Sequence, residues 1–108
     1  MRKKSLILAT ALIGTLALAP RAEAKDACKT LICMAGKPGI GNGKISGGCH
    51  GAVSDFFNIR VFGMWGYKPG RTATKRSRFL HECTGALVNE ETVMKIIAIY
   101  GTLMFDPT

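Results

Sequence analysis

Four cysteines, Cys28, Cys33, Cys49 and Cys83, are the residues of this 108-residue chain whose type and spacing point most directly to chemistry. Thiols in proteins form disulfides, bind metals or act as nucleophiles. Zinc sites usually bring cysteines in C-x2-C pairs, and these spacings contain no such pair. An even number of cysteines in a short chain is typical of a disulfide framework if the chain is exported, as residues 1–24 predict. The sequence therefore predicts two disulfides, with no metal site and no free thiol.

The pairing of these cysteines is only partly constrained by the sequence. Cys28 and Cys33 are five residues apart on one expected helix, so their side chains point about 140° apart. A bridge between the two is therefore not expected. Each is expected to bond with Cys49 or Cys83, and both of the remaining pairings stay open.

The start of the chain has the pattern of a cleavable secretion signal. Basic residues at positions 2–4 precede an apolar run over residues 6–19, and residues 22–24 read Ala-Glu-Ala, the motif that a signal peptidase recognises. The apolar run is shorter than the about 20 residues that span a bilayer as a helix. The sequence thus predicts a signal peptide over residues 1–24 and a single periplasmic domain over residues 25–108, without a transmembrane segment. Disulfides persist in that compartment.

Hydrophobic periodicity predicts an all-α domain of three to four short helices, held together by the disulfides. Asp26 is a good N-cap for a first helix, whose inner face would hold Ala27, Leu31 and Ala35, with Cys28 and Ile32 beside them. In the second helix, apolar residues recur from Ala52 to Ile59 at helical spacing. Thr74 is a plausible N-cap for the third helix. The expected helices span residues 26–35, 49–59, 74–83 and 89–104.

The glycine-rich segment after the first helix does not match a phosphate-binding motif. A P-loop would need glycine where the chain has Pro38, and the dinucleotide fingerprint is broken at Ser46. The segment is therefore interpreted as a connector leading to Cys49. No cofactor is expected.

Basic and aromatic residues cluster in the middle of the chain. The chain has 15 Lys and Arg against 7 Asp and Glu, which favours acidic neighbours such as cell-wall polymers, lipid headgroups or an acidic protein face. Nucleic acid is not expected for an exported domain. Lys75, Arg76 and Arg78 are expected to face water on the third helix. The candidate partner-binding residues are Trp65, Tyr67, Lys68, Arg71, Lys75, Arg76 and Arg78. Two alternatives stay open: a helix face that is only solvated, and an aromatic loop over residues 61–72 that covers the core.

Residues for catalysis are scarce. His50 and His81 are the only histidines, and each is next to a cysteine of the expected framework. Neighbours in sequence on a helix point apart, so His81 and Glu82 do not form a ready-made pair. The sequence predicts a binding protein with no catalytic residues.

Three segments resemble a known family in their order and spacing. They are an L-x-C-M-x-G segment, a cysteine leading to an F-F-x-I helix, and a T-x-x-x-R-F-L-x-x-C ending. Together they are similar to the small exported conjugal-transfer proteins called TrbM or KikA. The matching positions are Leu31, Cys33, Met34, Gly36, Cys49, Phe56, Phe57, Ile59, Thr74, Arg78, Phe79, Leu80 and Cys83.

The resemblance covers about residues 28–85 and implies a function. It implies a periplasmic accessory protein of plasmid conjugation and type IV secretion, associated with mating-pair formation. The partner would be an envelope or secretion-apparatus protein, or the cell wall. The resemblance supplies no catalytic residues. Two other classes stay open: an exported toxic or host-interaction factor, and a cell-wall hydrolase that uses Glu82.

Overall fold

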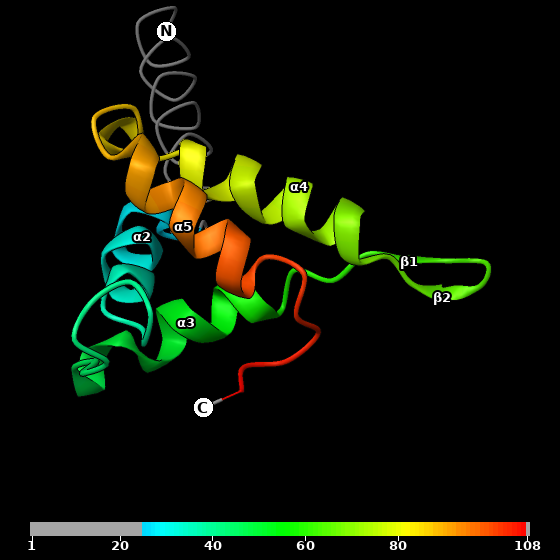
Figure 1. Cartoon of the computed structure of the whole chain (residues 1–108), viewed down its shortest axis with the longest axis horizontal. Helices are drawn as coiled ribbons and strands as arrows, with labels where there is room; N and C mark the ends of the chain where they lie inside the picture. The colour runs from blue at the N-terminus through cyan, green and yellow to red at the C-terminus, as the bar shows by residue number, and fades with distance from the viewer. Residues whose placement is uncertain (1–24, 108) are drawn as a thin grey trace, which may run out of the picture.

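The structure is a computed structural model that describes residues 25–107, and the expected signal peptide lies outside the described residues (Figure 1). In this part of the chain, helices are joined by short connections and one small hairpin. The helices are α2 (Ala27–Ala35), η1 (Gly47–Cys49), α3 (His50–Phe57), α4 (Pro69–His81), η2 (Thr84–Ala86) and α5 (Glu90–Tyr100). The strands are β1 (Phe62–Gly63) and β2 (Gly66–Tyr67). The prediction of a mainly helical domain is confirmed, whereas the hairpin was not expected.

Helix α2 begins as its N-cap predicts. The carboxylate of Asp26 accepts a hydrogen bond of 3.0 Å from the Lys29 backbone N–H, which satisfies one of the unpaired donors of the first turn. The prediction for Ile32 is wrong, because its side chain is 72% exposed. The inner face of α2 is rotated toward Thr30 and Met34, both fully buried.

Helix α3 packs against α2 and supplies the centre of the core. Phe56 is fully buried and Phe57 nearly so, as the periodicity predicted. The Thr30 hydroxyl donates a hydrogen bond of 3.1 Å to the Ala52 carbonyl. This bond fixes the two helices in register and satisfies a buried hydroxyl.

Two disulfides tie α2 to the rest of the domain. Cys28 is bonded to Cys83, just after α4, and Cys33 is bonded to Cys49, just before α3. The predicted framework is confirmed, including the absence of a Cys28–Cys33 bridge. Of the two pairings that the sequence left open, the structure has Cys28–Cys83 with Cys33–Cys49.

Helix α4 begins five residues earlier than expected, at Pro69 rather than at Thr74. Proline is favoured in the first turn of a helix, since its missing N–H would be unpaired there and its φ is already helical. The earlier start turns Arg71 into a helix residue. It also shortens the expected loop over residues 61–72, most of which is the β1–β2 hairpin.

Helix α5 lies between α2 and α4 in Figure 1 and closes the core with Val93, Ile96 and Tyr100. It ends at Tyr100, so the predicted continuation to Met104 is wrong. The tail returns over the domain, where the Lys37 ammonium lies 2.6 Å from the Asp106 carboxylate. Within residues 25–107, no helix is long and apolar enough to cross a membrane.

Candidate binding surface

The hairpin carries the most exposed large apolar side chains of the described residues. Phe62 pairs with Tyr67 across the two strands, with ring centroids 5.7 Å apart. The turn consists of Met64 and Trp65, each 88% exposed. The loop therefore does not cover the core, and its aromatic tip is presented to the surroundings.

The base of the hairpin is fixed to α4 and to the segment after α5. The Val61 N–H donates to the hydroxyl of buried Thr72 at 2.9 Å, and the Lys68 N–H donates to the Val61 carbonyl at 2.8 Å. The Tyr67 hydroxyl donates to the Thr102 carbonyl at 3.0 Å. These bonds hold the hairpin at a defined angle to the helix, while its tip extends away from the domain (Figure 1).

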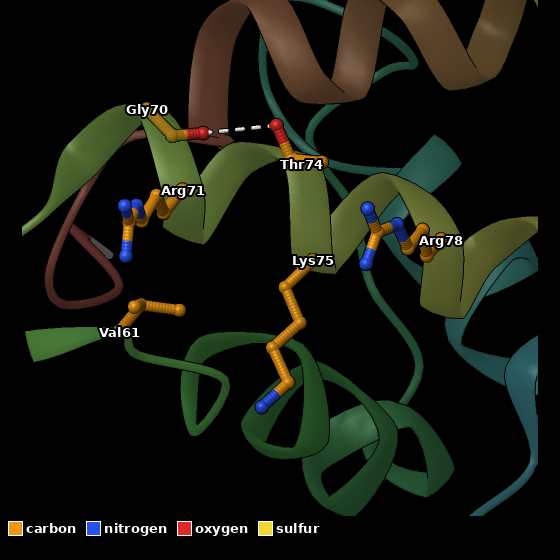
Figure 2. A pocket seen from close by; sticks show the side chains of 6 residues that line it. All are labelled: Val61, Gly70, Arg71, Thr74, Lys75 and Arg78. Carbon is orange, nitrogen blue, oxygen red and sulfur yellow. Dashed lines mark hydrogen bonds between the residues drawn. The ribbon is translucent and has the colours of Figure 1, made fainter.

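A basic face runs along the outer side of α4. We define it as Arg71, Lys75 and Arg78, whose spacing of four and three residues puts them on one side of a helix. All three are exposed. They line a hollow of about 530 Å³ together with Val61, Gly70 and Thr74. Figure 2 shows the three cationic side chains leaving α4 one after another, with Val61 across the hollow from the helix.

The charges of the basic face are not neutralised within residues 25–107. The ion pairs of this part of the chain involve other residues. The sequence has no Asp or Glu between Asp55 and Glu82, a stretch that includes the whole hairpin and α4. The face therefore presents uncompensated positive charge, which attracts anionic groups.

Arg76 does not belong to this face, and its predicted exposure is wrong. Its side chain is completely buried on the opposite side of α4. The guanidinium donates hydrogen bonds of 2.6 to 3.3 Å to backbone carbonyls. The acceptors lie at the ends of α3 and α5 or just beyond them: Phe56, Phe57, Ile59, Tyr100, Gly101 and Leu103.

The buried charge of Arg76 is stabilised by helix termini. The last carbonyls of a helix lack intrahelical partners and carry partial negative charge. The guanidinium carbon also lies 5.0 Å from the Phe56 ring centroid and 5.2 Å from that of Phe57, within range of a cation–π interaction. Burial lowers the pKa of Arg76, and the nearby Arg60 adds to the effect, yet an arginine stays protonated at neutral pH. Arg76 is thus a structural link among three helices.

The signal for this role was present in the sequence. Arg76 lies three and four residues before Phe79 and Leu80, and four residues after Thr72, so helical periodicity places it on the inner face. The prediction that Arg76 faces water followed from its charge and not from this periodicity.

The other predicted partner-binding residues, Trp65, Tyr67 and Lys68, lie in the hairpin or at its base. Lys68 is half-buried, and its aliphatic carbons lie against Gly63 in the hairpin. Tyr67 is also half-buried, with its hydroxyl used in the bond to Thr102. Trp65 stands at the tip. The surface formed by sequence-predicted residues therefore consists of Trp65, Lys68 and the basic face.

The histidines show one polar contact between helices. His81 Nε2 lies 2.7 Å from a carboxylate oxygen of Glu90, and Nδ1 lies 2.7 Å from the Ser77 carbonyl. The hydrogen bond with Glu90, followed by that with Ser77, raises the pKa of His81. Glu82, the residue considered for hydrolysis, is exposed and lines a hollow of about 380 Å³ with Asp26. Among the described residues, no group of three or more His, Cys, Asp and Glu could hold a metal ion.

No family model matches this chain, and the searches of curated proteins and of solved structures found no match either.

Proposed function

We propose that the chain is an exported, disulfide-stabilised accessory protein of plasmid conjugation and type IV secretion. It acts in the periplasm, where it binds an acidic component of the cell envelope through the basic face of α4 and the adjacent hairpin. No catalytic step is part of this function.

One observation carries the binding role: Arg71, Lys75 and Arg78 line a hollow without any carboxylate to neutralise them in the described part of the chain. Surface charges of one sign speed the encounter with oppositely charged partners and orient them. The two disulfides fit an oxidising compartment. The conjugative role is supported by the resemblance of residues 28–85 to TrbM or KikA.

The role in conjugation is tested by measuring the transfer frequency of the element that encodes this chain. An in-frame deletion should lower transfer by orders of magnitude, and only a gene that includes residues 1–24 should restore it in trans. Unchanged transfer would contradict the conjugative role and favour an exported host-interaction factor.

The binding surface is tested in the same assay by charge reversal. The triple variant Arg71→Glu, Lys75→Glu, Arg78→Glu should fail to restore transfer. Its matched control reverses three exposed lysines elsewhere, Lys29, Lys44 and Lys95, and so has the same net charge. The control should restore transfer, and equal behaviour of the two variants would exclude the basic face as the binding surface.

A further inference from the structure

The hairpin tip is an exposed apolar group that the helical domain does not explain. Met64 and Trp65 are 88% exposed and Phe62 is 60% exposed, and all three belong to the β1–β2 hairpin, which extends beyond the helices (Figure 1). Contiguous exposed apolar groups in a folded protein usually mark an interaction site. Because this tip is convex, it cannot enclose a small ligand. The tip can therefore bind only by inserting into a hollow or a layer of its partner.

The size of the hairpin matches the depth of a membrane interface. Each strand has two residues before the turn, and at about 3.3 Å per residue the tip lies roughly 7 to 10 Å beyond the base of the hairpin. Apolar side chains of interfacial proteins reach about 5 to 10 Å into the boundary between headgroups and acyl chains. Tryptophan is enriched at that level, since its ring is apolar and its N–H is polar.

Positive charge begins where the apolar tip ends. Lys68 lies at the base of the hairpin, with its aliphatic carbons against Gly63, so that its ammonium can remain in the headgroup layer while the stem covers apolar surface. Arg71 follows in the first turn of α4. At 1.5 Å per residue, Lys75 and Arg78 lie about 6 Å and 10 Å farther along the helix than Arg71. The positive charges of Lys68 and the basic face thus lie at increasing distances from the hairpin tip.

We propose that the hairpin inserts Met64 and Trp65 into the interface of an anionic phospholipid bilayer, while Lys68 and the basic face contact lipid phosphates. The charge complementarity favours anionic lipid: the stretch between Asp55 and Glu82 contains no carboxylate to repel it. This inference rests on the proposed function, since it names the partner of the same surface. It makes the protein a peripheral membrane protein attached by a short loop.

The sole tryptophan of the chain provides a direct measurement. The protein is purified after export from the full-length gene and mixed with vesicles of phosphatidylglycerol and phosphatidylcholine in equal amounts. Trp65 fluorescence should shift to shorter wavelength as the ring leaves water. Pure phosphatidylcholine vesicles should give no shift, and added salt should weaken binding because exposed charges are screened.

Cosedimentation with the same vesicles then compares matched variants. Trp65→Ser should weaken binding by at least about tenfold, since burial of a large apolar side chain is lost. Val88→Ser is the control, because Val88 is 86% exposed but lies far from the hairpin, between η2 and α5. Both substitutions are at exposed positions, so neither should impair folding.

Single charge removals test the orientation of the protein on the membrane. A basic residue near an anionic surface contributes about fivefold to binding, and the effect falls off within a Debye length. Arg71→Gln should therefore weaken binding about fivefold and Arg78→Gln less. Lys44→Gln, at an exposed site outside this surface, should have no effect. Equal losses for Arg71→Gln and Arg78→Gln would contradict insertion through the tip.

The outcomes separate this inference from the proposed function. If Trp65 fluorescence does not shift with anionic vesicles, the membrane inference is wrong. Charge reversal of the basic face that still abolishes transfer would then assign the surface to an acidic protein and leave the proposed function standing. If the vesicle results are as expected but transfer is unaffected by deletion, the membrane inference holds and the conjugative function is wrong.

Discussion

The two sides of α4 place the same residue type in opposite environments. Arg78 is exposed and lines a hollow, whereas Arg76, two positions earlier, is completely buried and bonded to the ends of α3 and α5. On the outer side, positive charge is left without a partner in the described residues. On the inner side, positive charge is surrounded by carbonyl oxygens. The position of an arginine around the helix axis, and not its charge, therefore determines whether it supports the fold.

Loss of the buried arginine should produce the largest effect. Arg76→Met should lower the free energy of unfolding by about 4 kcal/mol, because breaking a buried, hydrogen-bonded charged site costs about 3 to 5 kcal/mol. Carbonyls of α3 and α5 would be left without their donor. A small domain has only about 5 to 15 kcal/mol in total, so the variant should be close to unfolding. Urea denaturation of the oxidised protein measures the change.

Two further variants separate the role of the charge of Arg76 from that of its hydrogen-bonding geometry. Arg78→Met, on the outer side, should change the free energy of unfolding by less than about 0.5 kcal/mol. Arg76→Lys keeps the charge but cannot reproduce the planar fork of donors, and it should remain strongly destabilised. If Arg76→Lys is as stable as the natural protein, then the charge alone accounts for the role of Arg76 and the bonding geometry is unimportant.

Local signals in the sequence predicted much of the inner structure. The cap at Asp26, the stripe from Ala52 to Phe57 and the cysteine framework depend on spacing within one helix or on the composition of an exported chain, and the structure has all three. The pairing of Cys28 with Cys83 could not be predicted, because it depends on how α4 packs against α2.

The candidate surface was only partly predictable. Hairpins with two-residue turns usually have Asn-Gly or a glycine in the turn, but here the turn is Met64 and Trp65, and only the following Gly66 has a positive φ, of 112°. The turn residues therefore do not predict a hairpin. Pro69 marks the start of α4, whereas the N-cap preference of Thr74 predicts a helix that is too short.

A smaller effect is expected at the junction between the hairpin and α4, where two threonines differ as the arginines do. Thr72 is buried and its hydroxyl accepts from the Val61 N–H, whereas Thr74 is exposed and donates to the Gly70 carbonyl (Figure 2). Thr72→Val preserves the shape but leaves the Val61 N–H unpaired, which should cost about 1 to 2 kcal/mol.

Thr74→Val is the matched control for this change. Its hydroxyl bond is at the surface, so water can replace it, and the free energy of unfolding should change by less than about 0.5 kcal/mol. Urea denaturation compares the two variants, and hydrogen exchange of the Val61 amide should accelerate only in Thr72→Val. Unchanged exchange there would show that the hairpin is held by its other bonds, such as that of Tyr67 with Thr102.

The smallest effect is expected at the exposed end of α4, where His81 contacts Glu90 of α5. Because the pKa of His81 is raised in the folded protein by its hydrogen bonds to Glu90 and Ser77, the stabilisation is complete below the unfolded pKa of about 6.5. It is lost as the pH rises through the higher folded pKa. The pair is solvent-exposed, so the loss should stay below about 0.5 kcal/mol. Urea denaturation across this pH range should show that small decline in the natural protein and none in His81→Gln. His50→Gln, which removes the other exposed histidine, should retain the decline. If His81→Gln also retains it, the ion pair does not link α4 to α5, and the attachment of α4 depends on the inner side that holds Arg76.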